Sequence, residues 1–599
     1  MDKKSIIGAA ACVVLFLLWP KILLWTGMQA EPPPSAAIEA AAVPGTAAAM
    51  PGGETPPPAA GTSTAVNAAA SVAPVPAGEL LPEGPSSRDI GRPGVDTATV
   101  DLRTGALTSV RLEAYRDETL SGPQTLGHNG HGPGALTLNG KPLAGRWERV
   151  ASDDPQSLVV ERRLGAGLLL RQTWAARSDE SYRWDYVLEF INTGTQTAKL
   201  ARIGVGTGEV ALPAAQLARS FFISTNEYLS ADLRTAGEKQ KTEVFTEDAV
   251  YAFAGPAAAT VDKHVKKRAE LAATPVSWGA VHTKYFTFMV TGSFRGAAMS
   301  CETDAGQREN GLRYLGEELL LPELVLEPGK SCSVPLTVYA GPKERQLMRH
   351  LPDGVEGLLQ MNLFFFWQAD WMGWLARQIL GVMVWVHGVI GRPWAWGLAI
   401  ILITVCVKLL FWPLTHYTTL SMKKMQSLQP LVEEAKAKFK DSPQLAQQRV
   451  MEIYREHGVN PLGGCLPVLF QIPVFFALFN VFRGAIELRQ AQFLWVRDLS
   501  QPDTLQFLAN VVPIRPFAIL CGLTMLLQQM VTPSSMDPAQ KKMMMVMTVV
   551  FAVVFYGMPA GLTLYWTVNQ GLGIVQTLIT FRLVQQIGPH YQGAAVKKG

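Results

Sequence analysis

The chain has 599 residues, which is too long for one hydrophobic core, so two or more domains are expected. Its composition is 48% hydrophobic, which is high for a wholly soluble chain, and the apolar excess lies near the two ends. A net charge of +4 is nearly neutral at this length and gives no indication of nucleic-acid binding.

The six cysteines form no C-x-x-C pair, so zinc and thioredoxin-like sites lack support. Four of them lie in apolar segments, where cysteine behaves as a small hydrophobic residue. Cys301 and Cys332 share the middle domain and would be able to pair if that domain is exported.

Residues 1–26 begin with Lys3 and Lys4 and continue as an apolar run of about one membrane span. A cleaved signal peptide is the alternative, but its apolar region is usually shorter, so we predict an uncleaved signal anchor. Residues 27–87 are rich in proline, alanine and glycine and contain no cation before Arg88. This composition predicts a disordered tether.

Residues 88–350 show the alternation of half-buried strands. In Tyr182–Phe190 the even positions are apolar and Arg183, Asp185 and Glu189 face the other way. Similar runs separated by Gly, Asn and Asp turns predict a large antiparallel β-sandwich.

Residues 358–390 combine aromatic residues with a few cations. Trp371, Trp374 and Trp385 lie in one stretch with Arg377 and His387. Tryptophan is favoured at the membrane interface, so we predict an amphipathic interfacial helix.

Residues 391–583 hold five apolar segments of approximately spanning length. These segments are Trp394–Trp412, Leu462–Phe482, Pro516–Val531, Met543–Met558 and Leu562–Phe581. Together with the anchor they predict six spans, followed by a tail at 584–599.

The distribution of cations orients these spans. With the N-terminus inside, the inside segments contain fourteen cations: Lys3, Lys4, Lys423, Lys424, Lys436, Lys438, Lys440, Arg449, Arg455, Lys541, Lys542, Arg582, Lys597 and Lys598. The short outside connections contain only Arg483, Arg489, Arg497 and Arg515. Cations are enriched on the cytoplasmic side, so both termini are predicted inside and the β domain outside.

The largest inside connection, residues 417–459, is predicted to be a hairpin of two charged helices, the second opening at Pro443. It is longer than a connection between spans requires. We therefore favour a docking element over a solvated connector, with Lys423, Lys424, Lys436 and Lys438 as docking candidates.

Lys408 is the one charged residue within a span of this block. An ammonium group is costly in an apolar helix and by default faces a polar cavity, although snorkelling toward the nearby cytoplasmic end is an alternative. Thr404 and Thr415 share its helical face. In the last span Thr563, Thr567, Gln570 and Thr577 also share one face, and Gln471 interrupts the second. Such residues often serve only as hydrogen bonds between helices, but with a cation they favour a wet groove.

No catalytic motif is present, and His128 and His131 lie in a Gly/Asn loop where solvation is expected rather than a metal. Three classes remain open. A small-solute transporter predicts internal repeats, which are not seen. A membrane-anchored periplasmic glycan-binding protein does not need six spans. An insertase predicts a groove with no path through the membrane.

Several motifs in the last third resemble those of the YidC/Oxa/Alb insertases. The second core span is matched by Asn460–Pro467 and the run that begins at Gln471, and the loop after it by Glu487–Ala491 and Leu494–Ser500. Trp412–Thr415 and Met558–Trp566 are similar to the first and last core spans. The anchor, tether and β domain resemble the long Gram-negative members by architecture.

The resemblance implies insertion without ATP or any cofactor. A hydrophilic groove, open to the cytoplasm and to lipid, would receive hydrophobic segments of nascent membrane proteins, release them laterally into the inner membrane and aid their folding. It implies groove residues at Lys408, Thr404, Gln471, Thr563, Trp566, Thr567 and Gln570. The family usually carries arginine where this chain has Lys408, so the charge is kept without the bidentate fork. The hairpin implies contact with the ribosome and targeting machinery, and the outer β-supersandwich implies contact with the Sec translocon.

Overall fold

The structure is a computed structural model. It describes residues 87–117, 120–127, 132–143, 149–151, 154–165, 167–213, 230–236, 242–246, 264–271, 275–304, 312–361, 363–364, 367–368, 370–440, 442–459, 466–507, 512–532 and 538–586. The predicted anchor, His128, His131 and nearly all of the predicted tether and tail lie outside these residues.

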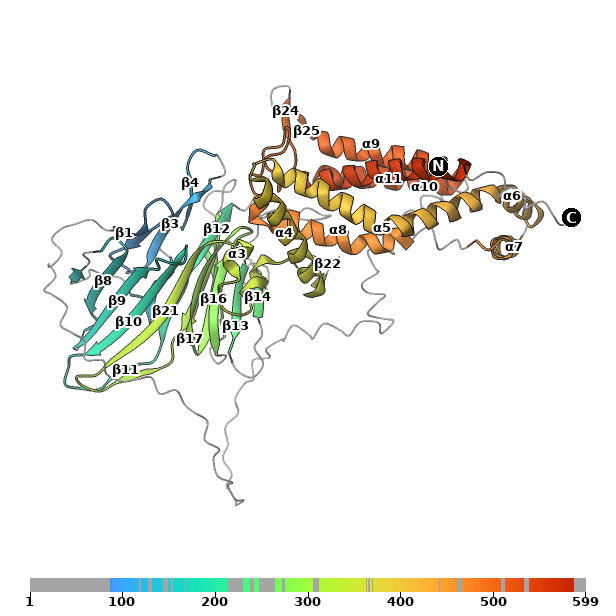
Figure 1. The fold of residues 1–599 in the computed structure, drawn as a ribbon. Coiled ribbons are helices and arrows are strands. Elements are labelled where there is room, and N and C mark those ends of the chain that lie inside the picture. Colours follow the sequence, from blue (N-terminus) through green and yellow to red (C-terminus); the bar gives the residue numbers. More distant parts are fainter. Residues whose placement is uncertain are drawn as a thin grey trace, which may run out of the picture. The chain divides into compact units, whose positions relative to one another are not determined.

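The β domain is built from three larger sheets (Figure 1). The nine-stranded sheet has the order β14 (Thr242–Thr246), β13 (Ser230–Thr235), β16 (Val276–His282), β17 (Phe286–Phe294), β21 (Ser331–Pro342), β10 (Arg183–Asn192), β9 (Leu168–Ala176), β8 (Ser157–Arg163) and β7 (Arg149–Ala151). The six-stranded sheet has the order β15 (His264–Leu271), β18 (Gly296–Asp304), β19 (Leu312–Leu320), β12 (Ile203–Pro213), β5 (Leu136–Leu138) and β6 (Lys141–Pro142). The four-stranded sheet runs β1 (Ser87–Arg92), β2 (Asp96–Asp101), β3 (Leu107–Arg116) and β4 (Pro123–Leu126).

Three two-stranded sheets complete the strands. They are β11 (Ala198–Leu200) with β20 (Leu324–Leu326), β22 (Leu363–Phe364) with β23 (Trp367–Gln368), and β24 (Leu505–Phe507) with β25 (Val512–Ile514).

The nine- and six-stranded sheets pack against each other through β12, β13, β16 and β19, which makes a sandwich. Strand β10 has the predicted alternation, because Trp184, Tyr186, Leu188 and Phe190 are all buried. Tyr186 stacks on Trp174 of β9, with ring centroids 4.0 Å apart. Neighbouring strands are antiparallel throughout the pairs described, so the prediction of an antiparallel β-sandwich is confirmed.

The β domain is followed by α3 (Arg345–Met348), the 3-10 helix η2 (Val355–Leu359) and α4 (Asp370–Ile390). The remaining elements are α5 (Ala395–Ser427), α6 (Gln429–Lys438), α7 (Pro443–Glu456), α8 (Leu466–Gly484), η4 (Ile486–Leu488), α9 (Pro516–Val531), α10 (Pro538–Tyr556) and α11 (Ala560–Gln586). Helix α11 packs between α5 and α9, α10 packs on α9, and α8 contacts α4, α5 and α11. The prediction of a helical core with a large β domain is confirmed.

Two described helices, Trp371–Ile390 and Ala395–Ser427, have both the length and the hydropathy of a membrane span. Helix α9 is apolar but shorter, and its bounds are those predicted. The exposed face of α4 carries Trp371, Trp374 and Trp385. The interfacial placement of α4 stays a prediction, because its length and hydropathy also suit a spanning helix.

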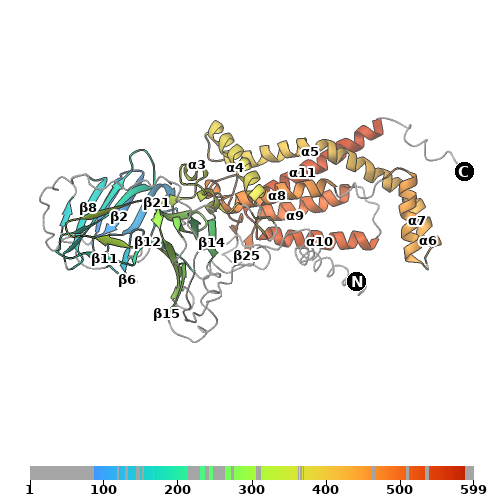
Figure 2. The same ribbon diagram turned by 90° about the horizontal axis from the view of Figure 1, so that it is seen from below.

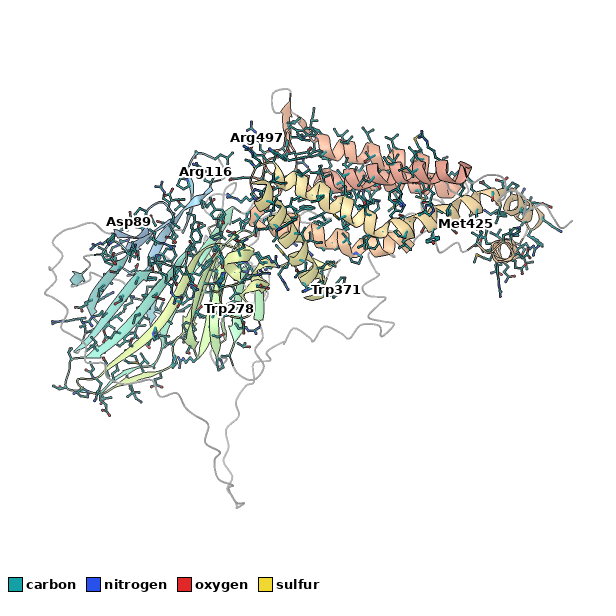
Figure 3. All side chains as sticks on the ribbon, in the orientation of Figure 1. Asp89, Arg116, Trp278, Trp371, Met425 and Arg497 are labelled. Atoms are coloured by element: carbon teal, nitrogen blue, oxygen red, sulfur yellow. The ribbon has the colours of Figure 1, made fainter. Side chains whose placement is uncertain are left out.

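Helices α6 and α7 form a hairpin at the end of α5 that is remote from α4 (Figure 2). The hairpin has a small core of its own, made by Leu428, Val432, Val450, Tyr454 and Val459. Trp278 is buried within the β domain, whereas Met425 packs against the hairpin core (Figure 3). The first hairpin helix is shorter than predicted, because residues up to Ser427 continue α5 and α6 starts next to Pro430.

Candidate functional site

Lys408 lies in the first half of α5, within a long apolar run. Its side chain is half-buried, and no carboxylate pairs with it among the residues that the structure describes. Pro413 lies inside the same helix and has no N–H, so the carbonyl of Leu409 receives no donor from position 413. The helix therefore carries a cation one turn before a position where its regular hydrogen-bond pattern is interrupted.

The absence of a side chain at Gly573 of α11 leaves space for the ammonium group of Lys408. A Cβ atom at position 573 would lie 3.5 Å from Lys408 Nζ and 3.0 Å from Gln528 Oε1 of α9. The Gln528 Oε1 atom is buried and accepts no hydrogen bond in the described structure. Three helices thus bring an ammonium group and an amide oxygen to one glycine.

The three threonines predicted to line the groove are buried in this structure, and their role in a groove stays a prediction. Thr404, Thr563 and Thr567 are buried, and each hydroxyl donates to a carbonyl of its own helix. Thr404 Oγ1 lies 2.7 Å from the oxygen of Ile400, and Thr567 Oγ1 lies 2.7 Å from that of Thr563. These hydroxyls are satisfied without water or substrate.

Gln471, Trp566 and Gln570 are half-buried. Trp566 contacts the rings of Phe475 and Phe555, with centroids 5.4 and 5.1 Å away, and its indole Nε1 has no partner in the described structure. The side chain of Gln471 is near the Tyr565 hydroxyl. Four of the predicted groove residues therefore have partly exposed side chains, namely Lys408, Gln471, Trp566 and Gln570.

The contact between the C-terminal halves of α5 and α11 was not predicted. The Gln576 amide donates to the Thr415 hydroxyl and, at 3.4 Å, to the Trp412 carbonyl. His416 Nδ1 lies 3.3 Å from Thr580 Oγ1. The i, i+4 spacing of Gln576 and Thr580 places both polar side chains on one face of α11, and this spacing is the feature of the sequence that could have indicated the contact.

The four predicted docking lysines differ in their surroundings. Lys424, Lys436 and Lys438 are exposed. Lys423 is half-buried, and its Nζ lies 4.9 Å from the centroid of the Phe581 ring of α11. Lys423 thus contributes to packing between α5 and α11.

The connection between α8 and α9 binds to the β domain. Arg489 donates to the Arg116 carbonyl at 2.8 Å, and Gln490 donates to the Asp117 carbonyl at 2.7 Å. The Tyr285 hydroxyl donates to Ser500 Oγ at 2.9 Å. The segments Glu487–Ala491 and Leu494–Ser500, which carry the resemblance of this loop, therefore form the junction between the two domains.

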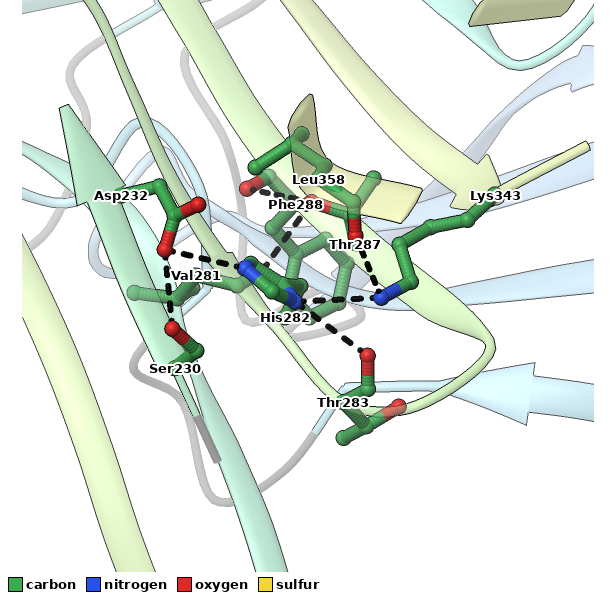
Figure 4. Close-up of polar contacts among 9 residues, drawn as sticks. All are labelled: Ser230, Asp232, Val281, His282, Thr283, Thr287, Phe288, Lys343 and Leu358. Atoms are coloured by element: carbon green, nitrogen blue, oxygen red, sulfur yellow. Dashed lines mark hydrogen bonds and ion pairs between the residues drawn. The ribbon is translucent and has the colours of Figure 1, made fainter. Parts of the chain in front are cut away.

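A second polar cluster is buried inside the β domain (Figure 4). His282 lies between Asp232, 3.2 Å from its Nε2, and Lys343, 3.2 Å from its Nδ1. Lys343 also donates to the Leu358 carbonyl of η2 at 2.9 Å. Burial and the neighbouring ammonium lower the pKa of His282, which favours the neutral ring with its proton on Nε2. The cluster joins η2 to the sheet and is closed to ligands, because all three side chains are fully buried.

The described residues contain no group of three or more His, Cys, Asp or Glu that is arranged to hold a metal ion. Cys332 has a free thiol, and the side chain of Cys301 lies outside the described set.

Comparison with known proteins gives matches to a family model, to curated sequences and to solved structures. The family model of the 60-kDa inner membrane protein matches residues 385–586. A membrane protein insertase YidC of Pelobacter propionicus is 32% identical over 86% of this chain and 91% of its own length. The corresponding protein of Geobacter metallireducens is 31% identical over 85% of this chain and 88% of its own.

Among solved structures, an active YidC insertase with its first transmembrane domain resolved covers 84% of this chain and 94% of its own, at 18% identity and a TM-score of 0.33. The sequence matches extend across both the β domain and the helical core. The chain belongs to the family of YidC membrane protein insertases.

Proposed function

We propose that this protein inserts hydrophobic segments of nascent proteins into the inner membrane, and that the surroundings of Lys408 form its substrate groove. The observation that carries the proposal is the convergence of Lys408, Gln528 and Gly573 among α5, α9 and α11. An ammonium group without a carboxylate partner attracts the acidic or polar segment that precedes a hydrophobic span. No nucleotide or cofactor is needed, because the apolar segment gains free energy by entering lipid.

The topology we propose has the β domain and the α8–α9 connection outside and the α6–α7 hairpin inside. The contacts of Arg489, Gln490 and Ser500 with the β domain support it, because they require the connection and the domain to lie on one side. The excess of cations in the predicted inside segments points the same way.

Site-specific photocrosslinking to a ribosome-bound nascent membrane protein tests the groove. The probe belongs at Gln570, which is half-buried, rather than at Thr404 or Thr563, which are fully buried. Leu578 of the same helix is 48% exposed and serves as the control position, because its side chain points away from the neighbouring helices. We expect crosslinks to the nascent chain from position 570 and not from position 578.

The charge of Lys408 is tested by three substitutions in an insertion assay. Lys408→Arg should keep activity, because the positive charge is retained, whereas Lys408→Ala should lower it and Lys408→Glu should abolish it. Equal activity of the Arg and Glu variants would show that the charge is irrelevant.

We further propose that the hairpin receives substrate from the ribosome or the targeting machinery and that the β domain contacts the Sec translocon. The exposed Lys436 and Lys438 support the first of these contacts. Their replacement by Glu should weaken binding of ribosome–nascent-chain complexes. The same change at Lys541 and Lys542, which are exposed lysines of the next inside segment, is the control.

A further inference from the structure

A pocket of about 480 Å³ opens between α3 and the second half of α4. Arg345 and Arg349 line it from α3, and Gly381, Trp385, Gly388 and Val389 line it from α4. It is remote in sequence from Lys408 and is made by different helices.

The two arginines that line the pocket are not fully paired with acceptors. Arg345 is only 7% exposed, and its Nε atom has no hydrogen-bond partner in the described structure. Its guanidinium group lies against Gly381, where a Cβ atom would overlap Nη1. A buried guanidinium donor without an acceptor is costly, so the site lacks a negatively charged or strongly polar group.

The nearby carboxylates do not supply that group. Glu356 lies 3.9 Å from Arg349 Nε and is shared with Arg377, whose Nε is 3.4 Å from it. Glu487 accepts the backbone N–H of Arg345 at 3.1 Å. Glu356 is thus shared between Arg349 and Arg377, and Glu487 is engaged by the Arg345 backbone, which leaves the Nε donor of Arg345 without an acceptor among the described residues.

The opposite wall of the pocket is apolar and faces outward. Trp385 and Val389 are 66% and 69% exposed, and they continue the exposed face of α4 that also carries Trp371 and Trp374. His387 stacks on Trp396 at the start of α5, with ring centroids 4.4 Å apart. The pocket thus lies beside the end at which α5 begins, where an interface rich in tryptophan is expected.

We propose that this pocket binds the headgroup of an anionic phospholipid. Arg345 and Arg349 would hold the phosphate through charge-assisted hydrogen bonds, and the acyl chains would lie along Trp385 and Val389. A phospholipid fits better than a free anion, because the pocket joins paired guanidinium groups to an exposed apolar wall. In the proposed topology the lipid belongs to the outer leaflet of the inner membrane.

Native mass spectrometry of the full-length protein in detergent tests this, with phosphatidylglycerol, phosphatidylcholine and inorganic phosphate added separately. Arg349→Gln removes an exposed guanidinium from the pocket. Gly388→Leu fills the pocket without changing charge, since a Cβ atom there meets nothing within 4 Å. Arg392→Gln removes an exposed cation that follows α4 but does not line the pocket, and it is the matched control.

We expect the wild-type protein to retain phosphatidylglycerol in preference to phosphatidylcholine. Arg349→Gln should weaken that binding about tenfold, which corresponds to the loss of one hydrogen bond to a charged group. Gly388→Leu should also weaken it, because the leucine side chain occupies the space of the lipid. Arg392→Gln should leave it unchanged. The proposal is overturned if Arg392→Gln weakens binding as much as Arg349→Gln, if Gly388→Leu has no effect, or if an excess of inorganic phosphate displaces the lipid.

Discussion

Lys408 Nζ lies against the backbone of Gly573, at van der Waals distance from the position that a Cβ atom would take there. A side chain larger than a methyl group at position 573 would compete with the ammonium group for the place where α5, α9 and α11 meet.

The first prediction concerns this contact. Gly573→Leu should lower the rate of membrane-protein insertion severalfold, because the leucine occupies the space of the Lys408 ammonium group. The measurement is insertion of a Sec-independent reporter by the purified protein in liposomes. Gly571→Leu is the control, since a Cβ atom at Gly571 meets nothing within 4 Å. Equal losses in both variants would count against a role for the ammonium position.

The second prediction concerns the junction between the domains. The hydrogen bond from Tyr285 to Ser500 should appear as a coupling of about 1 kcal/mol in a double-mutant cycle of Tyr285→Phe and Ser500→Ala, measured by unfolding in detergent. Combining Tyr285→Phe with Ser427→Ala should give additive effects, because Ser427 bonds only within its own helix. Additivity of the first pair would mean that the junction bond contributes nothing.

The third prediction is a pH dependence that arises from Glu317. Burial raises the pKa of its carboxyl group to about 8, although a hydrogen bond from Thr207 opposes the shift and the charge of Asp232 adds to it. The folded protein therefore keeps a proton that the unfolded chain releases above about pH 4.5. This contribution to stability is complete below the unfolded pKa and is lost as pH rises toward 8.

Glu317→Gln removes that proton equilibrium. The free energy of unfolding of the variant, minus that of the wild type, should increase between pH 5 and pH 8 by up to about 1.4 kcal/mol per pH unit. Thermal unfolding followed by near-ultraviolet circular dichroism at several pH values measures this difference. A difference that does not change with pH would contradict the raised pKa.

The fourth prediction concerns the hairpin, which has its own small core. Val450→Ala should destabilise it by about 1–2 kcal/mol, because deletion of buried methyl groups leaves a cavity that few neighbours can fill. Hydrogen exchange in residues 429–456 should then become faster, while exchange in α11 stays the same. Leu445→Ala on the same helix changes an exposed side chain and should leave exchange unaltered.

Much of the fold could be predicted, because regular patterns give strong signals. The alternation in Tyr182–Phe190 identified β10, and the apolar run at Pro516–Val531 gave the bounds of α9. The apolar span at Trp394–Trp412 gave the start of α5 but not its end, since the helix continues beyond Trp412 to Ser427 through Pro413. The Thr415, Thr418 and Thr419 hydroxyls each donate to a carbonyl four residues earlier in the same helix, so this polar stretch remains helical although the apolar pattern has ended.

The candidate site was less predictable for a related reason. Helical spacing places Thr404 near Lys408 and Thr567 near Gln570, but it cannot say whether a hydroxyl faces a groove or its own helix. The convergence of Lys408 with Gln528 depends on the absence of a side chain at Gly573, which no helical pattern marks as significant. Contacts between distant elements, such as that of Arg489 with Arg116, also leave no local signal.

The attachment of the α8–α9 connection to the β domain has a mechanical consequence. Phe493 of this connection packs against Gly397 at the start of α5, so the ends of α5, α8 and α9 next to the β domain are held together. Helix α5 has 33 residues and is about 50 Å long, so a tilt of about 5° around its fixed end would move its other end by about 4 Å. Any separation of these helices would therefore be smallest at the ends that are joined to the β domain and largest at the ends near the hairpin. In the proposed topology, such a separation would give a substrate segment the widest gap on the cytoplasmic side and the narrowest on the outer side, which would permit entry into lipid and oppose leakage across the membrane.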